Sequence, residues 1–476
     1  MAAAAMSSRM PGLMLVLSIF FTFMLQEHLF SLAEEQGDTM KQMAAELDGH
    51  YENQTLTRVA FGSCNKQWRT NVLWDNIVDF HPQAYLWLGD AVYVKEKEGD
   101  NDANLRRAYS RQLKNKGYQR LLSSGAIIEG VYDDHDMSTN DGHKVNYTPQ
   151  RQSAYLDFLG HVSEDSPRRS RLGLFSAHVF GEPPRQVKVI FLDVRSLSDE
   201  PAIVVPECVA NLLWPVKPYL LALTRWAAVL LGITGRFHGD MLGTEQWSWL
   251  EAQLAGSEAS FHVLVSTVQV LSVNPIAEGW GHYPAAQSRL LALLRKHRPR
   301  GLVILSGDVH FAELLVTQPP SEGMREEEKE GKKEALEVTS SGMTHTCFAT
   351  TMGTCEMAVD RYDRHRLTPC SFFGGLNYGT IELDWEQQEA WVRVRNKRGE
   401  AVLQTFRRLD GSSPGAYLGE PWSINENNDL SFFIFAFLCV VSLASGVLWV
   451  FRWLLKRHCS KDEGRDRKIG QAKKEA

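Results

Sequence analysis

Cysteine, basic charge and long hydrophobic runs are all scarce in this chain of 476 residues. The seven cysteines exclude a small fold held together by disulfides, so a hydrophobic core must supply the stability. The 51 basic and 57 acidic side chains give a net charge of −6 without a basic stripe, which excludes nucleic acid as the expected partner. With 44% hydrophobic and 23% charged residues, the composition also excludes a disordered chain, a collagen-like fibre and a multi-span transporter.

Each end of the chain carries an apolar run that indicates targeting. The first follows the cationic Arg9 and turns polar at Gln26, which is typical of a secretory signal peptide over residues 1–33. An uncleaved anchor is the alternative, but the run is shorter than the roughly 20 residues that a span needs. The second run, at 432–451, is uncharged and of spanning length, so we expect a transmembrane helix over residues 430–454.

Basic residues follow this second run at once, and they predict a cytosolic tail over residues 455–476 with the body of the protein in the lumen. The alternative, a buried core helix, lacks a folded domain behind it to cover it. Lys473 and Lys474 lie third and fourth from the carboxyl end and resemble the dilysine retrieval signal of endoplasmic-reticulum membrane proteins, which implies retrieval machinery as a partner. Asn53 and Asn146 each begin an Asn-X-Thr sequence and are candidate N-glycan acceptors in that compartment.

Between the ends, residues 58–410 have the pattern of an α/β domain. Short apolar strands are predicted at 58–64, 84–88, 126–132, 187–192, 262–266 and 302–306. Helical spacing lies between several of them, as at 246–254 and 288–297. Six polar residues each lie at or just past the end of one of these strands; they are Cys64, Asp90, Asp134, Asp193, Asp308 and His310. Because catalytic groups of α/β sheets gather outside the carboxyl ends of the strands, we expect one site there.

Two insertions interrupt this pattern. Residues 319–334 are dense in charge of both signs and predict a solvated loop. Residues 209–235 are apolar but include Arg225, which argues against a full membrane span. Two interpretations remain for this second segment, a buried helix or an apolar hairpin lying in the lumenal leaflet as a second membrane contact.

The strand-end residues are suited to binding metals. Asp90 and Tyr93 lie three apart after one strand, and Asp308 and His310 lie two apart after another. Carboxylates suit hard cations and imidazole suits transition metals, while the Cys64 thiolate is a soft ligand that suits iron or zinc. The combination predicts one transition metal with oxygen-bound ions beside it. Each residue alone has an ordinary structural explanation, but burying so many carboxylates together without cations would cost several kcal/mol each.

Seven groups of residues between about 58 and 384 resemble motifs of the PhoD-like alkaline phosphatases, and they occur in the same order as in that family. They are Phe61-Gly-Ser-Cys-Asn65, Leu88-Gly-Asp-Ala-Val-Tyr93, Tyr132-Asp-Asp-His-Asp136 with Asn140-Asp141, Leu192-Asp-Val-Arg-Ser196, Met241-Leu-Gly-Thr-Glu-Gln-Trp-Ser-Trp-Leu250, Trp280-Gly-His-Tyr-Pro-Ala285 with Arg289, and Ser306-Gly-Asp-Val-His310. The resemblance implies the calcineurin-like metallophosphoesterase fold, two β-sheets sandwiched between helices, and hydrolysis of phosphate monoesters and diesters. Two departures are that Tyr132 replaces the family's usual Trp and that the small β domain preceding the catalytic domain in bacterial relatives is not recognised here.

The resemblance also implies a ligand set and a mechanism. It implies that Cys64, Asp90 and Tyr93 bind ferric iron; the residues that complete an iron–calcium cluster, with Asp90 shared, are Asn140, Asp308 and His310. Another divalent metal remains open. Hydroxide formed on the metal attacks phosphorus, and adjacent cations neutralise the phosphate oxygens. Asp134 and His135 match the Asp-Asp-His motif, and His135 is the candidate for protonating the leaving alcohol. Arg195 holds a phosphate oxygen or is a structural ion-pair partner.

Cysteine counting follows from this assignment. If Cys64 binds metal, the lumenal cysteines Cys208, Cys347, Cys355 and Cys370 form an even set able to make two disulfides, with three connectivities open. The alternative is that Cys64 pairs with another cysteine.

We therefore expect a membrane-anchored, metal-dependent phosphoesterase of the endoplasmic-reticulum lumen. Anchoring together with the apolar insertion makes a membrane-linked phosphoester the expected substrate. The alternatives are a monoesterase of soluble lumenal phosphates, and a non-catalytic receptor or retention factor that kept the fold.

Overall fold

The computed structural model describes residues 48–95, 101–205, 217–317, 335–347 and 366–409, together with Cys355, Val359 and Tyr362. The predicted signal peptide, transmembrane helix, cytosolic tail and solvated loop at 319–334 lie outside the described residues. Among the helices of the described ranges, none combines the length and the apolar character that a membrane crossing requires.

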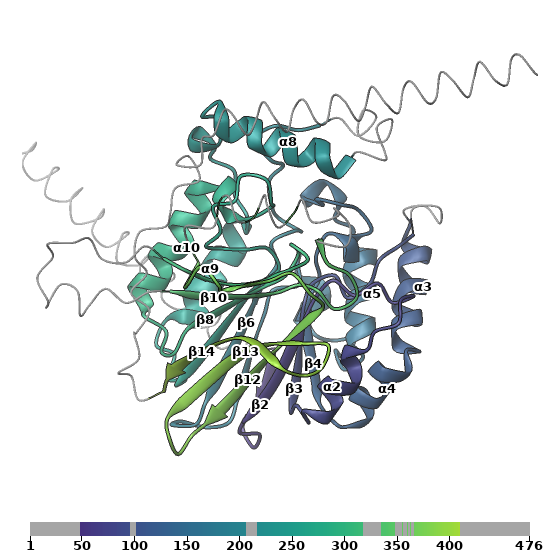
Figure 1. Cartoon of the computed structure of the whole chain (residues 1–476), viewed down its shortest axis with the longest axis vertical. Coiled ribbons are helices and arrows are strands. Elements are labelled where there is room, and N and C mark those ends of the chain that lie inside the picture. Colours follow the sequence, from purple (N-terminus) through teal and green to yellow (C-terminus); the bar gives the residue numbers. More distant parts are fainter. Residues whose placement is uncertain are drawn as a thin grey trace, which may run out of the picture.

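Two β-sheets form the centre of the fold (Figure 1). The eight-stranded sheet has the order β1-β5-β6-β7-β8-β10-β9-β11, and the six-stranded sheet has the order β14-β13-β12-β2-β3-β4. The strands of the first sheet are β1 (Gly49–Tyr51), β5 (Ser176–Phe180), β6 (Val187–Leu192), β7 (Phe261–Ser266), β8 (Val303–Ser306), β9 (Ala312–Val316), β10 (Leu336–Ser340) and β11 (Phe372–Phe373). Those of the second sheet are β2 (Arg58–Gly62), β3 (Ala84–Leu88), β4 (Ile127–Val131), β12 (Asn377–Asp384), β13 (Glu389–Asn396) and β14 (Ala401–Arg408).

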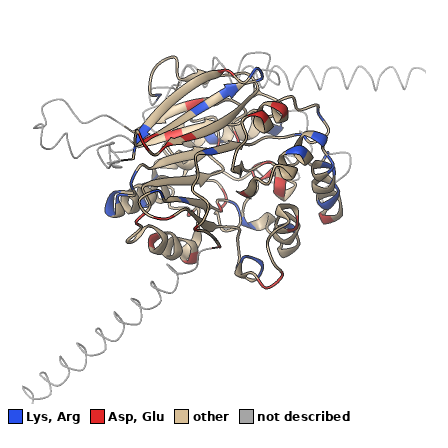
Figure 2. Ribbon diagram, turned by 90° about the horizontal axis from the view of Figure 1, so that it is seen from below, with Lys and Arg blue, Asp and Glu red and all other residues tan. Residues whose placement is uncertain are grey.

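Helices cover the outer face of the eight-stranded sheet and of the β2–β3–β4 part of the six-stranded sheet, giving the layered arrangement seen in Figure 1. The helices are α2 (Leu73–Asp79), α3 (Asp102–Leu113), α4 (Lys116–Ser123), α5 (Pro149–Leu159), α6 (Pro167–Ser170), α8 (Lys217–Leu230), α9 (Gly243–Leu254) and α10 (Pro284–His297). Short 3-10 turns are η2 (His135–Met137), η3 (Lys144–Asn146), η5 (Thr234–Arg236) and η6 (Trp280–His282). Acidic and basic side chains are interspersed over the ribbon (Figure 2).

The period-two alternation of the strands explains the layers. On β6, Val189 and Phe191 belong to the core between the two sheets, whereas Ile190 and Leu192 pack in the cluster formed with α9 and α10. Successive strand side chains point to opposite faces, so a strand covered on both sides is apolar throughout. This explains why β6, β7 and β8 are apolar on both faces in the sequence, with Lys188 and His262 as the exceptions within β6 and β7.

The expected mixed α/β class with two sheets between helices is confirmed, and the strands expected at 58–64, 84–88, 126–132, 187–192, 262–266 and 302–306 correspond to β2, β3, β4, β6, β7 and β8. The antiparallel strands β12, β13 and β14 were not expected. Their exposed face alternates with charged residues, among them Glu382, which accepts hydrogen bonds from Arg393 and Arg395.

Residues 217–230 of the apolar insertion form α8, which combines features of both interpretations. Trp226 and Val229 are buried, but Tyr219 is 42% exposed, and Leu231 and Ile233 just beyond the helix are 69% and 37% exposed. The helix is therefore packed against the domain on one side and presents an apolar side to its surroundings.

Candidate metal centre

The carboxyl ends of parallel strands from both sheets meet at one place. Cys64 and Asp90 follow β2 and β3 of the six-stranded sheet, and Asp308 and His310 follow β8 of the eight-stranded sheet. All four residues have positive φ, at 63°, 50°, 66° and 62°. Each such non-glycine conformation costs about 1–3 kcal/mol and is typical of functional sites, where the surrounding structure enforces it.

A glycine allows the two sheets to come so close. A Cβ atom on Gly307 would lie 2.6 Å from the carbonyl oxygen of Leu88 and 2.6 Å from the hydroxyl of Ser63. The loop after β8 can therefore rest on the ends of β2 and β3 only because this position lacks a side chain. The approach brings residues about 240 positions apart into direct contact, since the Cys64 thiol lies 3.7 Å from the Asp308 carbonyl oxygen.

The first group of ligand types at this seam is Cys64, Asp90 and His310, whose donor atoms all lie within 4.8 Å of one another. The Cys64 thiol is 3.6 Å from Asp90 Oδ2. Tyr93 joins the same group, because its hydroxyl donates to Asp90 Oδ2 at 2.5 Å and lies 3.3 Å from His310 Nε2. Thiol, carboxylate, imidazole and phenol are thus brought together, a set that suits a transition metal.

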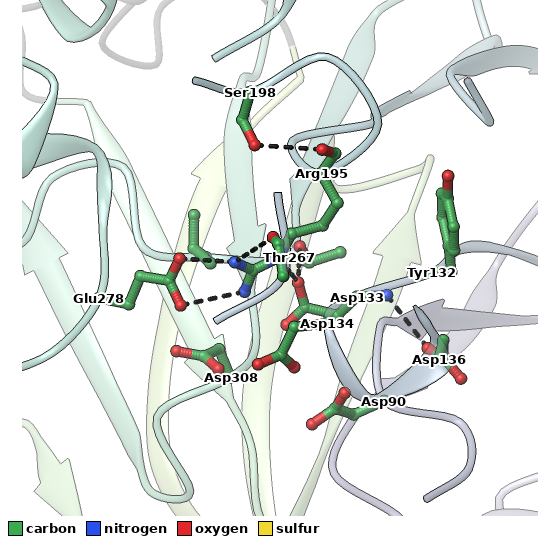
Figure 3. A network of polar contacts seen from close by, with 12 residues as sticks. Asp90, Tyr132, Asp133, Asp134, Asp136, Arg195, Ser198, Thr267, Glu278 and Asp308 are labelled. Atoms are coloured by element: carbon green, nitrogen blue, oxygen red, sulfur yellow. Dashed lines mark hydrogen bonds and ion pairs between the residues drawn. The ribbon is translucent and has the colours of Figure 1, made fainter. Parts of the chain in front are cut away.

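The second part of the site is acidic, and its carboxylates converge in Figure 3. Three further groups of possible metal-binding donors share Asp134: Asp90 with Asp134 and His135, Asp133 with Asp134 and Asp308, and Asp134 with Asp141 and Glu278. Asp90 belongs to both parts of the site. Oxygen-rich groups of this kind suit hard cations such as calcium.

Electrostatics shows that this site is short of positive charge. Burial raises the pKa of Asp90 well above its usual range, and the charges of Asp134 and Asp133 raise it further. Burial likewise raises the pKa of Asp308, reinforced by Asp133. Burial also raises the pKa of Glu278 to about 7. A raised carboxyl pKa means that the ionised group lacks nearby positive charge, which either a proton or a bound cation can supply. The residues therefore fit a metal cluster.

Two buried arginines supply part of the missing charge. Arg195 donates from Nε to Asp133 and from both terminal nitrogens to Glu278, at 2.5 and 3.2 Å (Figure 3). Its side chain is only 1% exposed. Arg225 of α8 pairs with Asp141 and donates to the Ile276 carbonyl oxygen at 2.8 Å. Arg195 therefore lies in the site as an ion-pair partner, and the apolar insertion contributes a cation to the same site.

The remaining residues that the sequence predicted for the site differ in where they lie relative to the candidate ligands. Asn140 donates from its amide to Asp141 at 2.7 Å, so it borders the acidic part. The ring of His135 lies on Tyr93, with ring centroids 4.1 Å apart. Asp193 is different from the other strand-end residues, because its oxygens accept from the backbone of Leu174, Arg195 and Ser196 and hold a turn.

His345 is a residue of the site that the sequence did not indicate. Its ring is 2% exposed and lies 4.2 Å from that of His310 and 5.3 Å from that of Tyr93. The Thr344 hydroxyl contacts the Cys64 carbonyl at 3.2 Å and His345 Nδ1 at 3.3 Å. Since a carbonyl only accepts, both contacts hold at once when Nδ1 carries the ring proton. The Nε2 lone pair is then a buried acceptor, for which no hydrogen-bond partner exists within the described part of the chain.

The sequence also missed Asp133, Glu278 and Arg225 as site residues. Asp133 is the first acid of the Asp-Asp-His motif, and Glu278 lies two positions before the Trp280-Gly-His motif, so both had a signal nearby. Arg225 interrupts an apolar run, where a buried cation indicates a specific partner.

The cysteine prediction is partly wrong. Cys347 and Cys355 form a disulfide, but Cys370 is a free, exposed thiol, so the even set does not make two bridges. Cys208 lies outside the described residues. Cys64 is a free, buried thiol, which rules out the alternative that it pairs with another cysteine.

Comparison with known proteins identifies this arrangement. A family model described as PhoD-like phosphatase matches residues 59–394. The chain belongs to the PhoD-like phosphatase family. The resemblance drawn from its motifs is thus confirmed, and the chain is a phosphoesterase hydrolase of a metal-dependent family.

A solved structure described as "Structure of PhoD" is similar to this PhoD-like chain with a TM-score of 0.50 and 16% sequence identity. The similarity covers 79% of this chain and 76% of that one. At this identity the likeness shows the fold alone. The search of curated proteins found no match.

Proposed function

We propose that this PhoD-like phosphoesterase hydrolyses phosphodiesters or phosphomonoesters presented at a membrane in the endoplasmic-reticulum lumen. The observation that supports it most is the meeting of Cys64, Asp90 and His310 at the seam of the two sheets, beside a shared acidic group. A soft donor next to hard donors suits two kinds of cation. Neighbouring metal ions can hydrolyse phosphoesters by activating water and neutralising phosphate oxygens.

We assign iron to Cys64, Asp90, Tyr93 and His310, and calcium to the oxygen-rich side formed by Asp134, Asp308 and Asn140. When bound, such cations supply Lewis acidity that activates water and neutralises phosphate oxygens. The free Nε2 of His345 supports this assignment, because a buried acceptor beside the expected ligands calls for a cation or a hydrogen-bond donor.

The protein's own side chains orient the substrate and handle the leaving group. His135 is only partly buried and lies on Tyr93, at the accessible side of the site, and we assign it to the leaving oxygen. Arg195 contacts Asp133 and Glu278, so we assign it to holding those carboxylates rather than to a phosphate oxygen.

Leaving-group dependence tests the assignment of His135. A proton donor matters most when the departing alcohol is basic, so His135→Gln should slow hydrolysis of an alkyl phosphoester far more than that of a nitrophenyl ester. An equal loss on both esters would contradict the assignment.

The central experiment is metal quantification on the purified full-length chain, combined with a panel of matched mono- and diesters. We expect bound iron and calcium, with hydrolysis that chelation abolishes. Cys64→Ser should lose iron and activity together, and Cys370→Ser is the matched control because that thiol is exposed and belongs to none of the groups of possible metal ligands among the described residues. Absence of hydrolysis on every ester would reject the proposal, and a clear preference for soluble monoesters would favour the monoesterase alternative.

The exposed apolar side of α8 supports access to membrane substrates, because Arg225 of the same helix reaches Asp141 in the site. Replacing both Leu231 and Ile233 by serine should depress turnover of a phosphoester lipid in vesicles and spare a soluble aryl phosphate. Val72→Ser, at another exposed apolar position, is the control. Equal losses on both substrates would reject membrane access.

The proposed location in the endoplasmic reticulum can be tested by the glycosylation of the full-length chain. Asn53 is exposed, whereas the Asn146 side chain accepts from the His143 backbone, so we expect glycosylation first at Asn53. The glycan should stay sensitive to endoglycosidase H if the chain is retained in the endoplasmic reticulum. Loss of that sensitivity after Lys473 and Lys474 are replaced by alanine would support the retrieval signal; an unchanged glycan would reject it.

A further inference from the structure

Two perpendicular aromatic rings border the Cys64 side of the site. The Tyr93 and Trp68 rings are edge to face, with centroids 6.5 Å apart and an angle of 87° between their planes. Tyr93 is 3% exposed and its hydroxyl donates to Asp90, whereas Trp68 is 39% exposed. The pair therefore extends from the candidate metal ligands to the surface.

Each of these rings has an ammonium group over it. Lys66 Nζ lies 5.0 Å from the Tyr93 centroid, and Lys95 Nζ lies 4.8 Å from the Trp68 centroid. Both distances are within the range in which the ring quadrupole attracts a cation. A third cation, Arg69, is fixed next to them by a hydrogen bond from Nη1 to the Thr344 carbonyl oxygen at 3.4 Å.

The positive charge of this rim acts on the interior of the site. Burial lowers the pKa of His310, and the charge of Lys66 lowers it further. Burial also lowers the pKa of His345, with Lys66 and Arg69 both adding to the effect. The rim cations thus act on imidazoles of the site, whereas Arg195 and Arg225 pair with its carboxylates.

The two lysines are at different depths. Lys66 stands over the ring that contacts Asp90, so the phosphorus that is attacked is within its field. Lys95 stands over Trp68, the more exposed ring of the pair. With the scissile phosphate at the proposed metal ligands, a cation held there by a cation–π contact would face the group to which the phosphate is esterified.

We propose that Lys95, held over Trp68 and assisted by Arg69, binds a second anionic group on the substrate. The substrate class is a phosphoester whose alcohol or second ester substituent carries a further phosphate or carboxylate. This inference rests on the proposed phosphoesterase function and narrows its substrates.

The experiment compares 4-carboxyphenyl phosphate with 4-carbamoylphenyl phosphate, which differ mainly in charge at the far end of the leaving group. The full-length, metal-loaded protein should prefer the carboxylate by about two- to fivefold in kcat/KM at low ionic strength, the size expected for an exposed ion pair. The preference should shrink as salt is added, because exposed charges are screened.

Variants separate the rim from general effects. Lys95→Met should bring the ratio of the two kcat/KM values to about one, and Lys95→Arg should keep the preference. Trp68→Ala should reduce the ratio and Trp68→Phe should retain it, because a phenyl ring still attracts the ammonium group. Arg185→Met is the matched control, since this exposed cation precedes β6 at the opposite end of the strands and should leave the ratio unchanged.

The outcomes are distinguishable. Hydrolysis of neither ester would reject the proposed function and this inference with it. Hydrolysis of both esters at equal kcat/KM by the wild type, or a ratio unchanged by Lys95→Met, would reject the inference alone and leave the phosphoesterase function standing.

Discussion

Replacing Glu129 by glutamine should remove a large share of the protein's stability without touching the candidate metal centre. Glu129 lies on β4 of the six-stranded sheet and contacts His178 on β5 of the other sheet, at 3.3 Å. It also accepts from Arg168 at 3.2 Å and from His161 at 2.7 Å. The Nε and Nη2 atoms of Arg168 have no hydrogen-bond partner within the described ranges, so Glu129 is the main counter-charge of a buried guanidinium.

The magnitude follows from the ionisation of this carboxyl group. Burial opposes it, but the charges of His178 and Arg168 prevail and lower the pKa of Glu129 from 4.5 to about 2. Burial lowers the pKa of His178 itself to about 4, so His178 adds its charge only in acid and Arg168 is the counter-charge at pH 7. The lowering of the Glu129 pKa corresponds to about 3 kcal/mol, which agrees with the 3–5 kcal/mol measured when one partner of a buried ion pair is removed. A depressed carboxyl pKa stabilises the folded state fully above about pH 4.5, and the effect is lost as the pH falls towards 2.

Urea unfolding of both proteins at pH 7 and at pH 3 provides the assay. Glu129→Gln should lower the free energy of unfolding by about 3 kcal/mol at pH 7, and the gap between the two proteins should narrow at pH 3. Glu164→Gln is the control, because that side chain is 88% exposed and its ion pair with Arg169 is worth little. A loss below about 1 kcal/mol at pH 7, or a gap that does not depend on pH, would refute the reasoning.

Three further predictions concern the site and strand β6 of the eight-stranded sheet. Asp90→Asn and Cys64→Ser should each lower metal content by elemental analysis together with activity, and unchanged metal in either variant would remove that residue from the ligand set. Arg195→Lys loses the paired hydrogen bonds from the guanidinium to Glu278, so the free energy of unfolding in urea should fall by about 1–3 kcal/mol. A raised KM with unchanged stability would instead indicate a phosphate contact. Burial lowers the pKa of Lys188 from 10.5 to about 8, because the charged ammonium is poorly solvated in the folded state. This destabilisation of the folded state is complete below pH 8 and absent above pH 10.5. The stability of Lys188→Met relative to wild type should therefore be about 3 kcal/mol greater at pH 7 than above pH 10.5, and a constant difference would contradict this.

The sequence predicted the parallel centre of the fold because those strands are buried on both faces. Residues 84–88 are apolar without interruption and 187–192 are apolar except for Lys188, and they correspond to β3 and β6. The hairpins of β12–β14 escaped detection, because one face is exposed and charged residues such as Arg393 break the apolar run. The layers could thus be predicted where burial is two-sided and not where it is one-sided.

The sequence predicted those residues of the candidate site that lie at the carboxyl ends of parallel strands. Cys64, Asp90 and His310 were identified because a parallel sheet brings the carboxyl ends of its strands to one edge. The same rule misplaced Asp193, whose oxygens are used by the backbone of its own turn. His345 lies in an irregular loop, and no local pattern in the sequence indicates where such a loop returns.

The seam between the sheets has a consequence for biosynthesis. Cys64 and Asp90 leave the ribosome early, but His310 must be added before the first group of ligands is complete, some two hundred residues later. A cation captured by Cys64 and Asp90 alone would lack the nitrogen donor of His310. Under the proposed ligand assignment, the complete metal centre would therefore form late in the maturation of the nascent chain, after the eight-stranded sheet has docked against the six-stranded sheet.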